Sequence, residues 1–189
     1  MPEDCEEEFY LSEYSGKLFV NLEDEEDDTE YLAGEARLFV VHAEAAEREG
    51  YSLFEVLDLR AESAAYMPLI GTEAGNFSAP VCRILGEEMV FSRNMLILDR
   101  LTIEPKFRGQ ALGLRYIRAA LQRFSIGCRI AAIKPFPLQF EGKVTDSNKA
   151  EFRAATTKLK KYYGREGFRP IKGTDLMILD LEERFPDHY

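Results

Sequence analysis

The chain has 189 residues, 46% of them apolar, and carries a formal net charge of −10 at pH 7. This length suffices for one domain with a substantial core, and no apolar run is long enough to predict a membrane span. The three cysteines and two histidines lack the spacings of a disulfide framework or a metal site, and Lys and Arg are not clustered as nucleic-acid binding requires.

The negative charge is concentrated at the N-terminal end. Residues 1–30 hold 13 of the 34 acidic residues and one base, Lys17. The densest run, 23–28, is expected to be a solvated loop; the alternative is an acidic rim that attracts a cationic substrate. We expect 1–30 to form an acidic N-terminal strand or arm and 31–189 to form the main domain. The start of the chain is acidic rather than basic and apolar, which favours a cytoplasmic location.

The first half predicts two strands followed by helices. The β-rich apolar segments 17–22 and 36–41 are expected to be strands joined through the acidic run. Apolar residues spaced three to four apart predict an amphipathic helix over 53–66, capped by Ser52. A shorter helix is expected over 78–85, because Pro80 lies in its first turn and Gly86 follows its end.

The second half alternates strands with helices. Residues 95–103 are nearly all apolar, as expected for a strand covered on both faces, and Leu114 begins an apolar helical repeat that extends to Phe124. Further elements are a strand at 129–133, a helix at 148–163 and a last strand at 175–181. A strand, a helix and a strand within about forty residues form a βαβ unit. The predicted class is α/β with a mixed sheet.

A loop rich in small residues lies between the buried strand and the amphipathic helix. It reads Arg-Gly-Gln-Ala-Leu-Gly over 108–113. Free amides at a helix start, together with the helix dipole, favour an anion, and small side chains let a diphosphate approach the backbone. The alternative is a tight turn without a ligand.

This loop and a second motif resemble the GNAT superfamily of acetyltransferases. Arg108, Ala111 and Gly113 match its [Gln/Arg]-x-x-[Gly/Ala]-x-[Gly/Ala] pattern between a strand and a helix, and 161–168 is similar to its C-terminal Tyr-x-x-x-Gly-Phe. The resemblance covers about 94–181, with a coenzyme motif at 94–124 and a C-terminal motif at 148–181. It implies a single-domain GNAT-like fold with a mixed, mostly antiparallel sheet flanked by helices.

The resemblance also implies a reaction and the residues for it. The chain would move an acetyl group from acetyl-CoA to a primary amine of an unidentified small molecule or protein, without a metal. Ile103 would offer backbone groups to the pantetheine arm, and Tyr163 would be the general acid that protonates the leaving thiolate. The diphosphate would bind to the amides of Arg108, Gly109, Gln110, Ala111, Leu112 and Gly113. Helical periodicity alone gives a different picture of the tyrosine pair, with Tyr162 in the core and Tyr163 on the surface.

Asp99 is the candidate general base. It interrupts an apolar strand, and a buried carboxylate with a raised pKa would suit removal of a proton from an ammonium group. Strict alternation places it on the face of Ile97 and Leu101, with Arg100 on the other face. The alternative is that Asp99 pairs with a group on another strand. Glu104 is a second candidate.

Other functions stay open at this stage. Thr156 stands where the family often has Asn, which favours a non-catalytic acyl-CoA-binding regulatory module. An interaction protein with an acidic arm is a third possibility and predicts no coenzyme binding. Neither nucleic acid nor a membrane is expected as a partner, and homodimer formation is left open.

Overall fold

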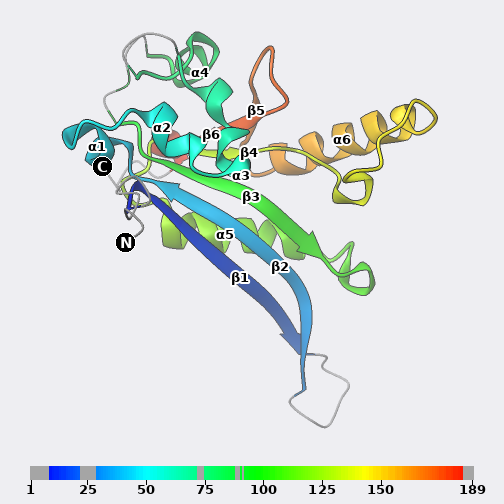
Figure 1. The fold of residues 1–189 in the computed structure, drawn as a ribbon. Helices are drawn as coiled ribbons and strands as arrows, with labels where there is room; N and C mark the ends of the chain where they lie inside the picture. Colours follow the sequence, from blue (N-terminus) through cyan, green and yellow to red (C-terminus); the bar gives the residue numbers. More distant parts are fainter. Residues whose placement is uncertain (1–8, 22–28, 72–74, 88–89, 91, 185–189) are drawn as a thin grey trace, which may run out of the picture.

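The protein is built around one six-stranded sheet with helices on both faces (Figure 1). The computed structural model describes residues 9–21, 29–71, 75–87, 90 and 92–184. The strand order is β1-β2-β3-β4-β6-β5. The strands are β1 (Leu11–Asn21), β2 (Glu30–Val41), β3 (Met95–Ile103), β4 (Ile130–Ile133), β5 (Arg169–Pro170) and β6 (Met177–Asp180). Only β3 and β4 pair in parallel among these strands. The predicted α/β class with a mixed, mostly antiparallel sheet is confirmed.

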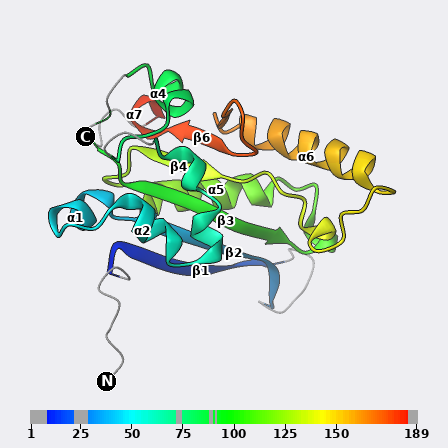
Figure 2. The same ribbon diagram turned by 45° about the horizontal axis from the view of Figure 1, so that its top comes forward.

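The helices divide the core into two layers, one on each face of the sheet (Figure 2). The α-helices are α1 (Ala43–Arg48), α2 (Leu53–Asp58), α3 (Ala61–Ala64), α4 (Ala79–Leu85), α5 (Leu112–Phe124), α6 (Lys149–Gly164) and α7 (Leu181–Arg184). The 3-10 turns are η2 (Met67–Leu69), η3 (Pro105–Phe107) and η4 (Leu138–Phe140). Helices α1, α2 and α4 pack on one face with Phe39 and Ile97, and α5 packs on the other with Leu38 and Leu96. Alternate residues of each strand therefore serve alternate layers.

The two N-terminal strands are longer than predicted. β1 begins at Leu11 rather than Lys17, and β2 begins at Glu30 rather than Ala36. The sequence pattern missed these extensions because an edge strand has few neighbours and most of β1 is exposed, so it needs no apolar run. The acidic run 23–28 lies outside the described residues. Strand β1, from the predicted N-terminal arm, pairs with β2 along its whole length.

The helix predicted over 53–66 is two short helices instead. Ser52 caps α2 and forms a capping box with Glu55, as the sequence suggests, but the helix ends at Asp58. Arg60 then adopts an extended conformation and begins α3. The Ser63 hydroxyl donates to the carbonyl oxygens of Leu57 and Arg60, which stabilises the turn between the two helices. The break leaves Arg60 directed at Glu13 of β1, to which it donates at 2.9 Å.

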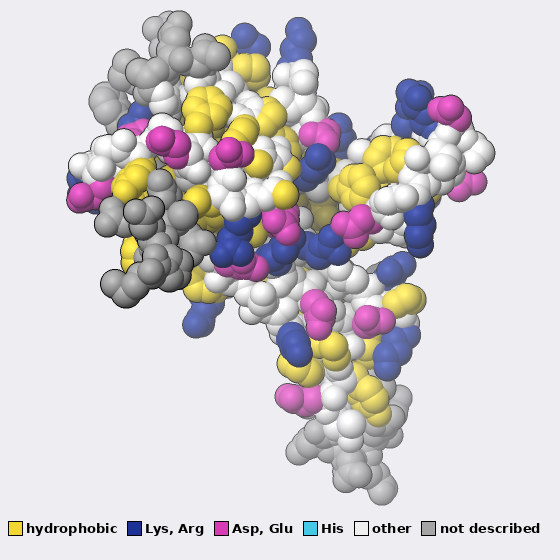
Figure 3. Space-filling view, in the orientation of Figure 1, with side chains coloured by type: hydrophobic (Ala, Val, Ile, Leu, Met, Phe, Trp, Pro, Cys, Tyr) yellow, Lys and Arg dark blue, Asp and Glu magenta, His cyan; other side chains and the backbone are white. Residues whose placement is uncertain are grey.

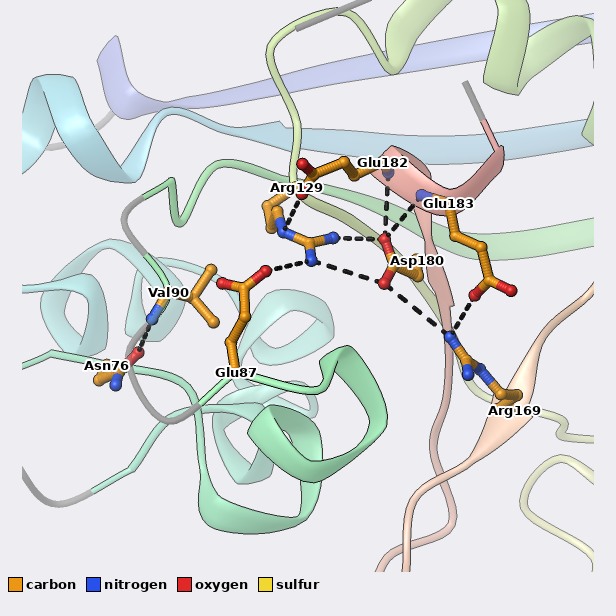
Figure 4. A network of polar contacts seen from close by, with 8 residues as sticks. All are labelled: Asn76, Glu87, Val90, Arg129, Arg169, Asp180, Glu182 and Glu183. Atoms are coloured by element: carbon orange, nitrogen blue, oxygen red, sulfur yellow. Dashed lines mark hydrogen bonds and ion pairs between the residues drawn. The ribbon is translucent and has the colours of Figure 1, made fainter. Parts of the chain in front are cut away.

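A buried ionic network holds the end of the sheet at which β4 begins and β6 ends (Figure 4). Arg129 is 5% exposed and pairs with Asp180 at the end of β6, with Glu87 and with Glu182. Asp180 also accepts from the amides of Glu182 and Glu183 at the start of α7. A buried guanidinium requires such partners, because an unpaired charge in the core is costly. This end of the β4–β6 pair is therefore fixed.

Helix α6 stands out from the body of the molecule (Figure 1). It spans Lys149–Gly164, close to the predicted 148–163, and Tyr163 is its one fully buried residue. Its beginning is tied to the preceding segment by aromatic contacts of Phe152 with Phe136 and Phe140. In the described ranges, every helix is too short or too polar to cross a bilayer.

Candidate active site

The sheet opens between β3 and β4. Met95–Leu98 of β3 pair with Ile130–Ile133, and β4 then ends. Pro135 and Pro137 follow, and proline cannot continue a central strand because it lacks an amide hydrogen. β3 continues for five more residues, 99–103: residues 100–103 are paired with β2 on one side, and none of the five has a β4 partner on the other. The unpaired side of β3 is an edge inside the molecule.

A pocket of about 260 Å³ lies at this opening. Its lining includes Tyr66, which packs in the layer of α1 and α2, and Tyr163, which packs in the layer of α5. The pocket is therefore reached by side chains from both faces of the sheet. The remaining lining residues are Arg37, Glu62, Ala65, Leu98, Asp99, Arg100, Leu101, Ile133, Lys134, Phe136, Leu138 and Glu141. Figure 3 shows positive and negative side chains alternating where the body of the molecule meets α6.

Asp99 lies in a β-bulge and pairs with a neighbouring strand. Leu38 of β2 is opposite Leu98 and Arg37 is opposite Arg100, so Asp99 has no partner in the ladder. Arg37 Nε donates to Asp99 Oδ2 at 2.8 Å, its Nη2 lies 2.7 Å from the same oxygen, and its Nη1 lies 3.0 Å from Glu62. The other carboxylate oxygen, Oδ1, has no hydrogen-bond partner among the described residues. Asp99 thus lines the pocket with one oxygen fixed by Arg37 and one oxygen without a partner among the described residues.

The bulge also corrects the predicted alternation along β3. Ile97 packs in the layer of α1 and α2, whereas Leu101 packs against the layer of α5. The prediction that Asp99 and Leu101 share the face of Ile97 is therefore wrong for Leu101. One extra residue in a bulge reverses the faces of the residues after it.

Tyr163 is buried at the pocket, contrary to the surface position that helical periodicity predicts. It is 8% exposed and contacts the rings of Tyr162 and Phe168. Burial, with a smaller contribution from Tyr162, raises the pKa of Tyr163 to about 12. Periodicity fails here because α6 contacts the body mainly at its C-terminal end. The apolar stripe along the helix therefore does not determine which of its residues are buried. The phenol is held protonated at neutral pH and can donate a proton.

Tyr162 is half-buried and packs against the core layer of α5, where it reaches the start of that helix. Its hydroxyl oxygen accepts from the Leu114 amide at 3.1 Å. A Cβ atom on Gly113 would lie 2.9 Å from the Tyr162 hydroxyl, so glycine is needed for this approach. The adjacent tyrosines of α6 therefore reach two places at once: Tyr162 contacts the first turn of α5, and Tyr163 lines the pocket.

The loop before α5 presents open amides. The Arg108 amide donates to the Pro105 carbonyl at 3.3 Å. The next five amides, from Gly109 to Gly113, have no hydrogen-bond partner among the described residues. Gly109 and Ala111 are left-handed, with φ of +83° and +57°, and Ala111 is the one described non-glycine residue with positive φ. An alanine in this region stores backbone strain, which occurs preferentially at functional sites.

The Arg108 side chain binds the end of β3. Its Nε donates to the Ile103 carbonyl at 2.9 Å, so the guanidinium closes the turn between strand and loop. Both residues were assigned from the sequence to direct coenzyme contacts. In this structure the Ile103 carbonyl and the Arg108 side chain satisfy one another. The loop and the opening in the sheet nevertheless lie next to each other, because β3 ends only five residues before Arg108.

Two residues at the site were not identified from the sequence. Arg37 was missed although charges are few where β2 and β3 pair: Glu35 and Arg37 in β2, and Asp99 and Arg100 in β3. Opposite charges in two largely apolar strands are a signal that the strands meet. Tyr66 was missed because the residues around it do not distinguish a core tyrosine from one at a site. Among the described residues, no group of three or more His, Cys, Asp or Glu side chains could hold a metal ion.

Comparison with known proteins gives one structural similarity. A crystal structure described as an acetyltransferase is similar over 88% of this chain and 70% of that chain, with 14% sequence identity and a TM-score of 0.37. No protein-family model matches the sequence. The curated proteins contain no match either.

Proposed function

We propose that this protein is an acyltransferase that moves an acetyl group from acetyl-CoA to a primary amine. One observation carries the proposal: five consecutive open amides, Gly109–Gly113, lie at the start of a thirteen-residue helix beside an opening in the sheet. A row of unpaired amides at a helix start favours a diphosphate. The sequence prediction rests on the resemblance of 94–181 to GNAT acetyltransferases, and this resemblance indicates that the diphosphate is that of coenzyme A.

The fit of the coenzyme to the residues can be argued in two parts. Leu112 and Gly113 are buried, so partners for their amides are worth more than they would be in open solvent. The unpaired edge of β3, 99–103, leads from this loop to the pocket, and a pantetheine arm carries amide groups that can pair with such an edge. The thioester would then lie in the pocket that Tyr163 lines.

The chemistry requires an acid and a place for the amine. The ammonium group first loses a proton to water. Attack of the neutral amine nitrogen on the thioester carbonyl forms the C–N bond, and breaking the C–S bond releases a thiolate. The proton that the nitrogen loses as it becomes an amide balances the proton that the thiolate takes. Tyr163, whose pKa burial raises to about 12, is protonated and can supply the proton that the thiolate takes. Asp99 lines the pocket, and its Oδ1, which has no partner among the described residues, can accept a hydrogen bond from the incoming ammonium group. Because Arg37 holds the other oxygen, we assign Asp99 the role of binding the amine rather than the role of removing its proton.

Calorimetric titration with acetyl-CoA, followed by a panel of small amines and basic peptides, tests the proposal. Binding should release or absorb heat and should raise the melting temperature, since a ligand at about 100 times its Kd adds about 2.7 kcal/mol to the free energy of unfolding. Absence of both effects at saturating coenzyme contradicts the proposal. Binding without an acetylated product from any amine favours the regulatory acyl-CoA-binding module.

A further inference from the structure

Tyr66 lies at the apex of the opening, where β3 and β4 part. It follows α3, and its ring is 1% exposed in the layer of α1 and α2. The hydroxyl donates to the Leu98 carbonyl at 3.4 Å, and Leu98 is the last residue of β3 that is paired with β4. On the β4 side, Lys134, directly after the strand, lines the same pocket as Tyr66 and Leu98, and its backbone amide lies near enough to the hydroxyl to oppose the effect of burial, which raises the pKa of Tyr66.

Tyr66 also lies close to both residues assigned to the chemistry. Tyr66, Asp99 and Tyr163 all line the one pocket. The Asp99 carboxylate further raises the pKa of Tyr66, and Tyr163 lines the same pocket although Tyr66 and Tyr163 belong to opposite layers of the core. The hydroxyl is thus inserted into the sheet from one face and meets the pocket residues that come from the other.

We propose that the Tyr66 hydroxyl fixes the point at which β3 and β4 separate and thereby positions the acyl end of the coenzyme against Tyr163. Its neighbours on two sides, Leu98 and Lys134, lie in β3 and directly after β4, so the hydroxyl sets their spacing at the apex. Without it, the Leu98 carbonyl loses its partner at the point next to Lys134, and the strands can pair further or move apart. Either change displaces the end of the pocket and leaves the diphosphate loop unaltered. This role rests on the proposed function, and Tyr66 acts as a positioning residue.

The Tyr66→Phe variant tests this role, with Tyr116→Phe as a matched control. Phenylalanine retains the ring in the core and removes only the hydroxyl. Tyr116 is a half-buried tyrosine of α5 whose hydroxyl lies over Gly16 of β1, away from the pocket. Two probes separate the parts of the site: acetyl-CoA, and adenosine 3′-phosphate 5′-diphosphate, which is the coenzyme without its pantetheine arm.

Tyr66→Phe should weaken acetyl-CoA binding about tenfold, the loss expected for one hydrogen-bonding group with buried partners, and should leave the fragment's affinity unchanged. Turnover by Tyr66→Phe should also fall. Tyr116→Phe should leave the affinities for acetyl-CoA and for the fragment unchanged. Equal weakening of both probes, or no change in acetyl-CoA binding, overturns the positioning role, because a purely structural effect does not distinguish the arm from the diphosphate.

Amide hydrogen exchange separates failure of this inference from failure of the proposed function. If the wild-type protein binds neither probe, the proposed function is wrong, but exchange at Lys134 still reports on the apex. Faster exchange at Lys134 in Tyr66→Phe than in wild type, with no change in Tyr116→Phe, supports the placement of the hydroxyl. Unchanged exchange at Lys134 overturns it.

Discussion

Replacing Gly109 with alanine isolates the backbone conformation of the diphosphate loop. Gly109 has φ of +83° and is exposed, and no atom lies within 4 Å of the position that a Cβ would take. The substitution therefore adds no steric clash, and its effect is purely conformational. Gly127, after α5, offers a matched control: it is exposed, has φ of +74° and also has open space at its Cβ position.

The expected magnitude follows from the left-handed conformation. An L-amino acid in that region costs about 1–2 kcal/mol. In Gly127→Ala the whole cost should appear as a lower free energy of unfolding, equivalent to about 2–8 °C in melting temperature for a chain of this size. In Gly109→Ala the exposed loop can relax out of the left-handed region in the free protein. Coenzyme binding must then restore the conformation, so the Kd for acetyl-CoA should rise about 5- to 30-fold.

Thermal unfolding and calorimetric titration of the two variants measure both parts of this cost. Gly109→Ala should lose less stability than Gly127→Ala and should bind acetyl-CoA more weakly, whereas Gly127→Ala should bind it as tightly as wild type. The reasoning is refuted if Gly109→Ala melts close to wild type and retains wild-type affinity. That result would mean that the loop relaxes and that its left-handed form is not needed by the ligand.

Three further predictions follow from the side chains. Tyr163→Phe should lower turnover about 100-fold or more with little change in acetyl-CoA affinity, measured by steady-state kinetics and titration, and equal turnover would remove the phenol from the mechanism. Glu166 is 1% exposed and is held by Arg118 and Arg184. Glu166→Ala should therefore lower the free energy of unfolding, measured in urea, by about 3 kcal/mol, toward the low end for a broken buried pair because Arg118 is largely exposed. A loss of well under about 1 kcal/mol would contradict this. Burial lowers the pKa of His42, so its contribution to stability is complete above its unfolded pKa and is lost as the pH falls through the folded value. His42→Gln should therefore reduce the fall in melting temperature between about pH 7 and pH 5, and an unchanged fall would show that His42 is not responsible.

The sequence predicted the central part of the fold better than its periphery. β3 and α5 were found nearly to the residue, because a strand covered on both faces and a helix packed on a sheet have strong patterns. The split of 53–66 into two helices was not predictable from the same pattern. It depends on Ser63 bonding two carbonyl oxygens and on Arg60 reaching Glu13, which are contacts made only after folding.

The candidate site was predicted in its backbone and only partly in its side chains. The loop 108–113 could be found because small residues before a helix have a direct physical meaning. The partner of Asp99 was left open, since a bulge cannot be read from one strand and it decides which residues face Arg37. The burial of Tyr163 depends on where α6 touches the body, which its own periodicity does not contain.

The early end of β4 leaves one wall of the pocket outside the sheet. The chain continues from Lys134 through η4 to α6, and Phe136, Leu138 and Glu141 of this segment line the pocket. These residues take part in no strand pairing. Insertions and substitutions there can accumulate during evolution without disturbing the six-stranded framework. Related chains can therefore diverge in which molecules they admit while they keep the same scaffold and the same loop at the start of α5.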